Sequence, residues 1–197
     1  MRFWNRNSKL KYKSIEEASK DGDLRSVKHF LKLGDCNSIA LHYAAANDHL
    51  KVIDLLLKFG MDVNYVIPGG GTPLMAAAGA LSFNCIALLI KRGADPNLKG
   101  VDGRTPLMAL CQPGAIDVKQ QELCILALLE GGADIDCQSH SGSTALMKAA
   151  WFGNDGAAKV LIENGADKSL RDAKGRNAAM LAFQKGHQAL ANALKDD

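Results

Sequence analysis

Apolar residues in this chain recur in short stripes with the spacing of an α-helix. In segments 52–57 and 85–90 they occupy positions i, i+1, i+4 and i+5, and a shorter stripe lies at 160–161. This spacing is typical of an amphipathic helix with one buried face. Gly60, Gly93 and Gly165 follow the stripes, and glycine commonly ends a helix. The pattern therefore predicts a series of short helices, each stopped by a glycine.

A second signal marks the start of another helix ahead of these stripes. Its clearest copy is residues 103–109, with the sequence GRTPLMA. Gly103 permits the positive φ of a tight turn, Thr105 can cap the free N–H groups of a first turn, and Pro106 suits the first helical position. Related copies begin at residues 71, 143 and 176, with a weaker one at 39. Each copy predicts a first helix, followed by a second, striped helix.

The apolar residue after each helix start measures a repeating unit. The equivalent positions, separated by 26, 33, 33, 39 and 33 residues, are Ile15, Leu41, Leu74, Leu107, Leu146 and Ala179. A pair of short helices cannot bury its own apolar face and must stack on its neighbours, which gives an all-α repeat solenoid. We expect a single repeat domain at 14–197, with units at about 14–37, 38–70, 71–103, 104–142, 143–175 and 176–197.

These motifs resemble the ankyrin repeat. The helix start preceded by Asp-Gly stands at residues 102–107, and the ending LLIKRGADPN stands at 88–97, with related endings at residues 60, 132 and 165. The resemblance covers about 14–194, as six units of which the first and last act as caps. It implies antiparallel helix pairs, β-hairpin-like loops that project at right angles, and a concave face that binds another protein.

Three departures from the regular repeat carry their own expectations. The segment 34–39 is too short for a hairpin, so a bare turn should join the first two units. The fourth unit inserts six residues around 115–120, which either add an N-terminal turn to its second helix, capped by Asp117, or form a bulging loop. Where the family usually has histidine after the leucine, Met75, Met108, Met147 and Met180 stand instead, and we interpret them as core filler.

Composition and charge restrict the function classes. The chain is 47% hydrophobic and 23% charged, with a net charge of +3, so it should fold and gives no argument for nucleic-acid binding. Five cysteines without a Cys-x-x-Cys pair favour a reducing compartment over disulfides or a zinc module. Without an apolar run long enough to span a bilayer or a recognisable signal peptide, we expect a cytoplasmic monomer that does not bind membranes.

The N-terminal arm, residues 1–13, contains five of the 24 basic residues and no acidic one, so the remaining chain carries a net charge of −2. The favoured interpretation is a flexible, solvated tail, because termini usually fray. The alternative is an auxiliary segment for an acidic partner, anchored by Phe3 and Trp4.

Candidate chemistry in the sequence is sparse. Gly69–Thr72 has the glycines of a phosphate loop but lacks its lysine and falls where the repeat expects a hairpin turn. The histidines at 42, 49 and 187 are expected to be structural, and Cys85 and Cys124 fall in the buried stripes. With no nucleophile, base and orienting group in sight, we expect no catalytic residue, no metal, no cofactor and no small-molecule substrate.

The resemblance also indicates which residues a partner would contact. The family uses loop tips and two positions late in each first helix. From these positions the candidate partner-binding residues are Trp151, Phe152, Gln112, Asn47, Ala80, Arg104, His140, Lys174, Arg176, Gln184 and Lys185. Trp151 and Phe152 are the favoured hot spot, although Phe152 could instead pack on the fourth-unit insertion. Gly79 and Ala80 should leave a hollow beside this ridge, framed by positive charge.

Two functions follow. The first is a non-enzymatic protein-binding module that inhibits, neutralises or scaffolds its partner. The alternative is that the array is a substrate for asparagine hydroxylation. Asn64 and Asn97 have Leu56 and Leu89 eight residues upstream, and thereby resemble the asparagines hydroxylated in eukaryotic ankyrin repeats.

Overall fold

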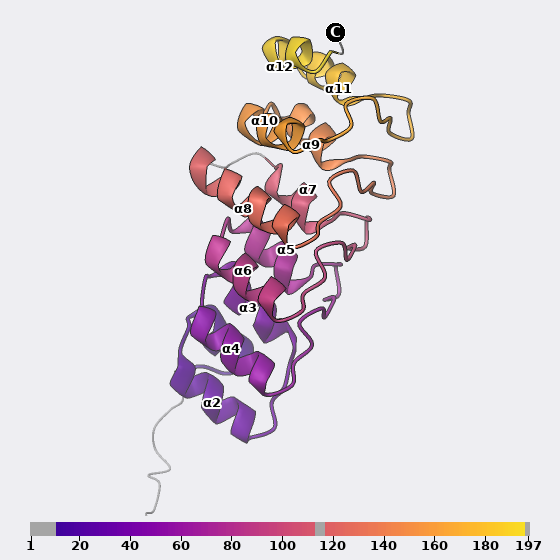
Figure 1. Ribbon diagram of the computed structural model, residues 1–197. Helices are drawn as coiled ribbons and strands as arrows, with labels where there is room; N and C mark the ends of the chain where they lie inside the picture. Colours follow the sequence, from indigo (N-terminus) through magenta and orange to yellow (C-terminus); the bar gives the residue numbers. More distant parts are fainter. Residues whose placement is uncertain (1–10, 113–116, 196–197) are drawn as a thin grey trace, which may run out of the picture.

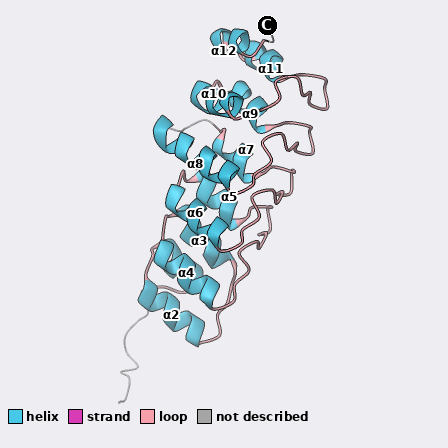
Figure 2. Cartoon of the chain, in the orientation of Figure 1, coloured by secondary structure: helices cyan, strands magenta, loops and turns pink. Residues whose placement is uncertain are grey.

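The computed structural model describes residues 11–112 and 117–195 as an elongated stack of short helices (Figure 1). Within these ranges the chain forms twelve helices and no strand (Figure 2). The connecting loops project from one side of the stack. The predicted all-α repeat solenoid is confirmed.

The helices form two layers. The inner layer, formed by the first helix of each unit, contains α1 (Ile15–Lys20), α3 (Ile39–Ala46), α5 (Pro73–Gly79), α7 (Pro106–Leu110), α9 (Ala145–Phe152) and α11 (Ala178–Gln184). The outer layer contains α2 (Leu24–Lys32), α4 (Leu50–Lys58), α6 (Phe83–Lys91), α8 (Val118–Glu130), α10 (Asp155–Glu163) and α12 (Gln188–Ala193). Each helix packs on its partner within the unit, and the inner helices pack on one another along the stack.

The inner helices begin as their capping residues predict. Thr72, Thr105 and Thr144 each accept a hydrogen bond from the backbone N–H three residues later, at 3.1, 3.4 and 3.2 Å. Asn177 does the same in the last unit, at 3.0 Å. These bonds satisfy N–H groups that a helix leaves without partners in its first turn.

The insertion in the fourth unit lengthens a helix. Helix α8 has 13 residues, whereas α2, α4, α6 and α10 have nine each. The carboxylate of Asp117 accepts from the N–H of Gln120 at 3.0 Å and caps it. The extra-turn alternative is therefore confirmed, while residues 113–116 lie outside the described part. In the first connection, residues 33–38 alone separate α2 from α3, as the bare turn requires.

The core runs along the stack between the two layers. Leu41, Leu74, Leu107 and Leu146 are fully buried in the inner layer, and the stripe residues of the outer helices face them. The predicted burial of Cys85 and Cys124 is confirmed. Burial raises the pKa of the Cys85 thiol to about 12 and that of Cys124 to about 11, so neither is a thiolate near neutral pH.

The methionine column is core only in its middle. Met108 and Met147 are buried, and Met75 is half-buried. Met180 is 48% exposed, so the expectation that it fills the core is wrong. It lies on α11 in the last unit of the stack, where α12 packs on one side of α11 and no seventh unit of the described chain stacks on the other.

The histidines join neighbouring units, as predicted. His42 Nε2 donates to the carbonyl oxygen of Gly71 at 2.8 Å, and His49 Nε2 donates to that of Lys20 at 2.9 Å. The ring of His187 lies over Gly153, where a Cβ atom would come within 2.4 Å of it. These contacts are structural.

Four projecting loops share one hairpin-like turn. In each, a backbone N–H donates to the carbonyl oxygen four residues later, from residues 67, 100, 139 and 172, at 2.9–3.0 Å. Neighbouring loops also bond directly, since the N–H of His140 donates to Asp102 O at 3.2 Å and that of Ala173 to Ser141 O at 3.0 Å. The glycines at 69–71 lie in the first of these turns, which agrees with the rejection of a phosphate loop.

Candidate partner-binding face

The candidate residues lie along the inner layer and its loops. Asn47 and Ala80 cap α3 and α5, and Gln112 follows the end of α7. Trp151 and Phe152 close α9, while Gln184 ends α11 and Lys185 caps it. The loops present the remaining candidates, Arg104, His140, Lys174 and Arg176. All eleven are exposed except Trp151 and Arg176, which are half-buried.

Trp151 is held by the next unit rather than standing free. Its indole packs partly against the core, Lys185 Nζ lies 3.8 Å from the ring centroid, and Arg176 Cζ lies 6.0 Å from it. The sixth unit stacks on α9 and thereby brings these cations over the indole. A cation over an indole face at these distances is attracted by the ring quadrupole. The candidate hot spot is therefore a tryptophan with two cations over its ring.

Phe152 is 37% exposed and is not among the side chains packed against the core. The added turn of α8 instead approaches α10, since Val118 Cγ1 lies 2.9 Å from where Gly156 would carry a Cβ. Contacts of Phe152 with residues 113–116 fall outside the described residues. Within the described chain, Phe152 presents apolar surface beside Trp151.

A buried carboxylate positions Arg176. Asp172 is buried, and its Oδ2 accepts from Arg176 Nη2 at 2.6 Å and from Nε at 2.9 Å. Arg176 Nη1 also donates to Gln184 Oε1 at 3.2 Å. Although burial alone would raise it, the hydrogen bonds from Arg176 and the backbone hold the pKa of the Asp172 carboxyl below its ordinary value. The guanidinium is thus fixed over the Trp151 ring.

Lys148 is a cation that the sequence analysis missed. It lies on α9, one turn before Trp151, and is half-buried. Burial lowers the pKa of its ammonium group, and the positive charge of Arg104 lowers it further. Among the described residues no carboxylate forms an ion pair with it. The sequence held a signal for it: Lys148 stands two residues after its repeat leucine, where the third and fourth units have the small apolar residues Ala76 and Ala109.

A cavity lies between two of the projecting loops. It has a volume of about 410 Å³, opens between the loops of the third and fourth units, and is lined by Met75, Val101, Arg104, Ala109 and Gln112 with the glycines at 69–71. Gly79 and Ala80 do not line this cavity. They are exposed, and a Cβ atom on Gly79 would meet nothing within 4 Å, so the hollow expected beside them stays a prediction.

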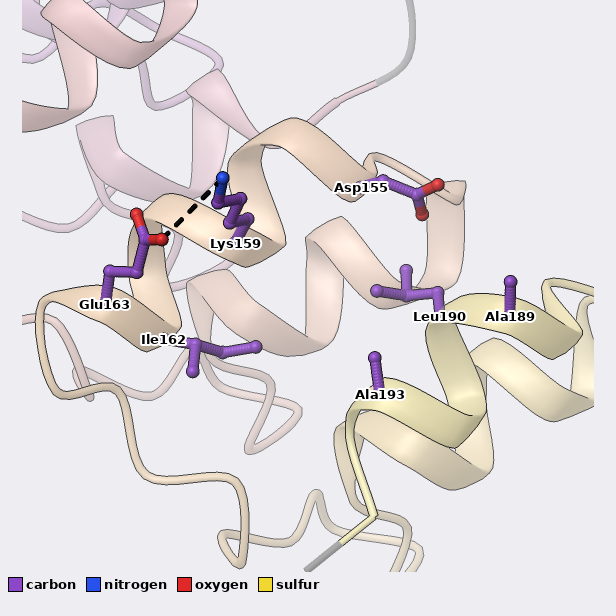
Figure 3. Close-up of a pocket in the computed structure, with 7 residues that line it drawn as sticks. All are labelled: Asp155, Lys159, Ile162, Glu163, Ala189, Leu190 and Ala193. Atoms are coloured by element: carbon purple, nitrogen blue, oxygen red, sulfur yellow. Dashed lines mark ion pairs between the residues drawn. The ribbon is translucent and has the colours of Figure 1, made fainter.

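Two apolar surfaces near the C-terminal end were not predicted from the sequence. A groove of about 470 Å³ separates α10 from α12, with Ile162, Leu190 and Ala193 on its walls and an ion pair between Lys159 and Glu163 beside it (Figure 3). The end of the stack presents Phe183, which is 65% exposed. The signal was available, since the equivalent position holds alanine or cysteine in the four preceding units.

Asn64 and Asn97 join the loop of one unit to the next. Asn64 Oδ1 accepts from the N–H of Asp95 at 2.8 Å, and its Nδ2 donates to Gly93 O at 3.3 Å. Asn97 makes the same pair of bonds to Asp134 N and Gly132 O, at 2.7 and 2.9 Å. Both side-chain amides therefore have a structural role.

Comparison with known families agrees with this architecture. A family model described as ankyrin repeats (3 copies) matches residues 15–100, 79–172 and 115–197. The chain belongs to the ankyrin-repeat family. The projecting loops, the inner helices and the concave face between them are thus those of an ankyrin-repeat domain, and domains of this family are generally protein-interaction modules.

Curated ankyrin-repeat relatives match parts of longer proteins. Ankyrin repeat protein R664 of Acanthamoeba polyphaga mimivirus is 46% identical over 28% of this chain and 34% of its own length. Ankyrin repeat and SOCS box protein 11 of Danio rerio is 38% identical over 69% of this chain and 33% of its own length. Palmitoyltransferase AKR1 of Naumovozyma castellii, named as an enzyme, is 35% identical over 81% of this chain and 22% of its own length. The chain thus spans about a third or less of these relatives.

Among the described residues, no cluster of three or more His, Cys, Asp or Glu side chains could hold a metal ion. No helix in the same part of the chain is long and apolar enough to cross a membrane.

Proposed function

We propose that this ankyrin-repeat domain is a non-enzymatic module that binds a protein partner on its concave face, with Trp151 and Phe152 at the centre of the contact. The supporting observation is the Trp151 indole, held between the core and the cations of the sixth unit, beside the exposed Phe152 ring. Tryptophan and arginine are enriched among residues that dominate interface energetics. A partner would therefore meet a rigid apolar ridge with charges already in position.

The arrangement favours binding because its parts are preorganised. Asp172 holds Arg176, and the hairpin-like loops are bonded to each other through their backbones. Side chains and loops that are ordered before association lose less conformational entropy when a partner binds. Binding of this kind would let the domain inhibit, neutralise or scaffold its partner.

Quantitative affinity capture from cells of the source organism tests the proposal. The variant Trp151→Ala, Phe152→Ala should lose the partner. A matched variant, Phe59→Ala, Phe183→Ala, removes two exposed aromatic side chains elsewhere and should retain it. Because Trp151 packs partly on the core, Lys185→Glu is a second variant that changes the same surface from an exposed position. Equal recovery with all four proteins would refute the proposed site.

The asparagine-hydroxylation alternative stays a prediction, since no observation favours it over the structural role of Asn64 and Asn97. Intact-mass measurement of the protein from its own host tests it, because hydroxylation adds one oxygen atom. The monomeric state and the cytoplasmic location also remain predictions, the latter resting on the cysteine pattern.

A further inference from the structure

Positive charge gathers on one half of the concave face. We define the cationic surface as Arg104, Lys148, Lys174, Arg176 and Lys185. It contains five basic residues, and Asp102 and Asp172 pair with two of them. The N-terminal half of the same face is neutral at its candidate positions, which are Asn47, Ala80 and their neighbours Ala46 and Gly79. Because residues 14–197 carry a net charge of −2, this surface is a local reversal of sign.

The members of the cationic surface form one connected patch. Lys148 is close enough to Arg104 to feel its charge, and Trp151 follows Lys148 by one helical turn. Lys185 and Arg176 both lie over the Trp151 ring. Lys174 shares a loop with Arg176. A ligand on the indole would thus meet Lys185 and Arg176 at the ring, with Lys148 one helical turn away.

Three of these cations are in no ion pair with a described residue. Arg104 and Arg176 are in ion pairs, whereas Lys148, Lys174 and Lys185 form none with any described residue. Lys148 is also half-buried, and the charge of Arg104 disfavours its ammonium form more than the charge of Asp102 favours it. A carboxylate from a partner would favour the charged form of Lys148.

We propose that the cationic surface binds an acidic segment of a protein partner, whose carboxylates pair with Lys148, Lys174 and Lys185 around an apolar contact on Trp151. The inference rests on the proposed function and adds the chemistry of the partner. An apolar ridge within the charged patch suits a peptide that mixes acidic and apolar side chains. Nucleic acid fits less well, because two of the five cations are already paired with Asp102 and Asp172 and residues 14–197 carry a net charge of −2, whereas phosphate binding depends on several unpaired cations.

Selection from a phage-displayed library of random peptides tests the inference on the full chain. Peptides captured by the wild type and eluted are sequenced, and their affinities are measured by fluorescence polarisation. We expect an excess of Asp and Glu in the selected peptides. Their affinity should fall about tenfold when NaCl rises from about 0.05 M to about 0.5 M, since exposed charge pairs are screened.

Two charge-matched variants separate this surface from general electrostatics. The triple variant Lys148→Gln, Lys174→Gln, Lys185→Gln should lower the affinity for the selected peptides about tenfold. Lys51→Gln, Lys91→Gln, Lys119→Gln removes the same charge from exposed positions of the outer layer and should change affinity less than about twofold. Circular dichroism should show that both variants are folded. Lys148→Gln, Lys174→Gln, Lys185→Gln should melt only slightly below the wild type, because Lys185 gives up its contact with the Trp151 ring while none of the six substituted side chains makes a hydrogen bond or ion pair.

Specified results would overturn the inference. Selected peptides without an acidic excess, or equal losses in both triple variants, would show that this surface does not choose acidic segments. A single-stranded DNA oligonucleotide that binds more tightly than the peptides would show that the ligand class is wrong. A different result would refute the proposed function: peptide binding that does not change with Trp151→Ala, Phe152→Ala. If the selected peptides are neutral but still need these two residues, the acidic partner alone is refuted.

Discussion

Contacts between neighbouring loops should contribute measurably to stability, and two glycines allow that contribution to be isolated. Gly103 and Gly175 occupy equivalent turns with the same φ of +75°. A Cβ atom on Gly103 would lie 2.5 Å from the backbone nitrogen of His140 in the next loop. A Cβ atom on Gly175 would meet nothing within 4 Å. The two Gly→Ala substitutions therefore share backbone strain and differ in the clash.

The magnitudes follow from these distances. Alanine at positive φ costs about 1 kcal/mol, which is the whole expected effect of Gly175→Ala. Gly103→Ala adds displacement of the fifth-unit loop and loss of the hydrogen bond from His140 N to Asp102 O, now 3.2 Å long. A hydrogen bond contributes about 1 kcal/mol net, so a total of about 2–3 kcal/mol is expected for Gly103→Ala.

Urea denaturation followed by circular dichroism at the helical band measures both variants. The difference in unfolding free energy between them, about 1–2 kcal/mol, is the quantity of interest, and the slope with urea should stay unchanged. If the two variants lose equal stability, direct packing between adjacent loops makes no net contribution, and the argument from the close approach is wrong.

Three other predictions address single features. The pKa of Asp172 is lowered in the fold, so its carboxylate stabilises the fold fully above about pH 4 and progressively less as the pH falls below that. Asp172→Asn should therefore flatten the acid side of a plot of melting temperature against pH, and an unchanged plot would contradict this. Asn97→Ala, which removes two hydrogen bonds between units, should cost about 1–3 kcal/mol in urea denaturation, and a loss near zero would argue against this role. Cys36, which is exposed, should react with a maleimide in the native protein before the three buried thiols do, as peptide mass mapping would report; early modification of Cys111 would refute its burial.

The scaffold could be predicted well from the sequence because the same helix caps and apolar spacing recur from unit to unit. The caps at Thr72, Thr105 and Thr144, the buried leucines and the extra turn behind Asp117 all follow from local spacing. Stripe periodicity reports which face of a helix is buried, and caps report where it begins. Both signals depend on residues close in sequence.

Features that depend on neighbouring units were harder to predict. Lys185 and Arg176 of the sixth unit contact the Trp151 ring of the fifth. Repeat spacing in the sequence does not give the direction of a long side chain, so these contacts could not be predicted from it. The exposure of Met180 depends on what covers α11, which the methionine pattern alone does not show. The cavity between the loops of the third and fourth units was not predicted, because its walls come from two loops that lie far apart in the sequence.

The added turn of α8 has a mechanical consequence. Gln120 Nε2 donates to Leu81 O of the third unit at 3.1 Å, and Val118 lies against Gly156 of the fifth. A solenoid flexes when neighbouring units rotate relative to each other. A helical turn that contacts the units on both sides restricts that rotation. We therefore expect the middle of the stack to behave as a stiff segment, whose curvature is set before any partner arrives, with bending confined to the two ends.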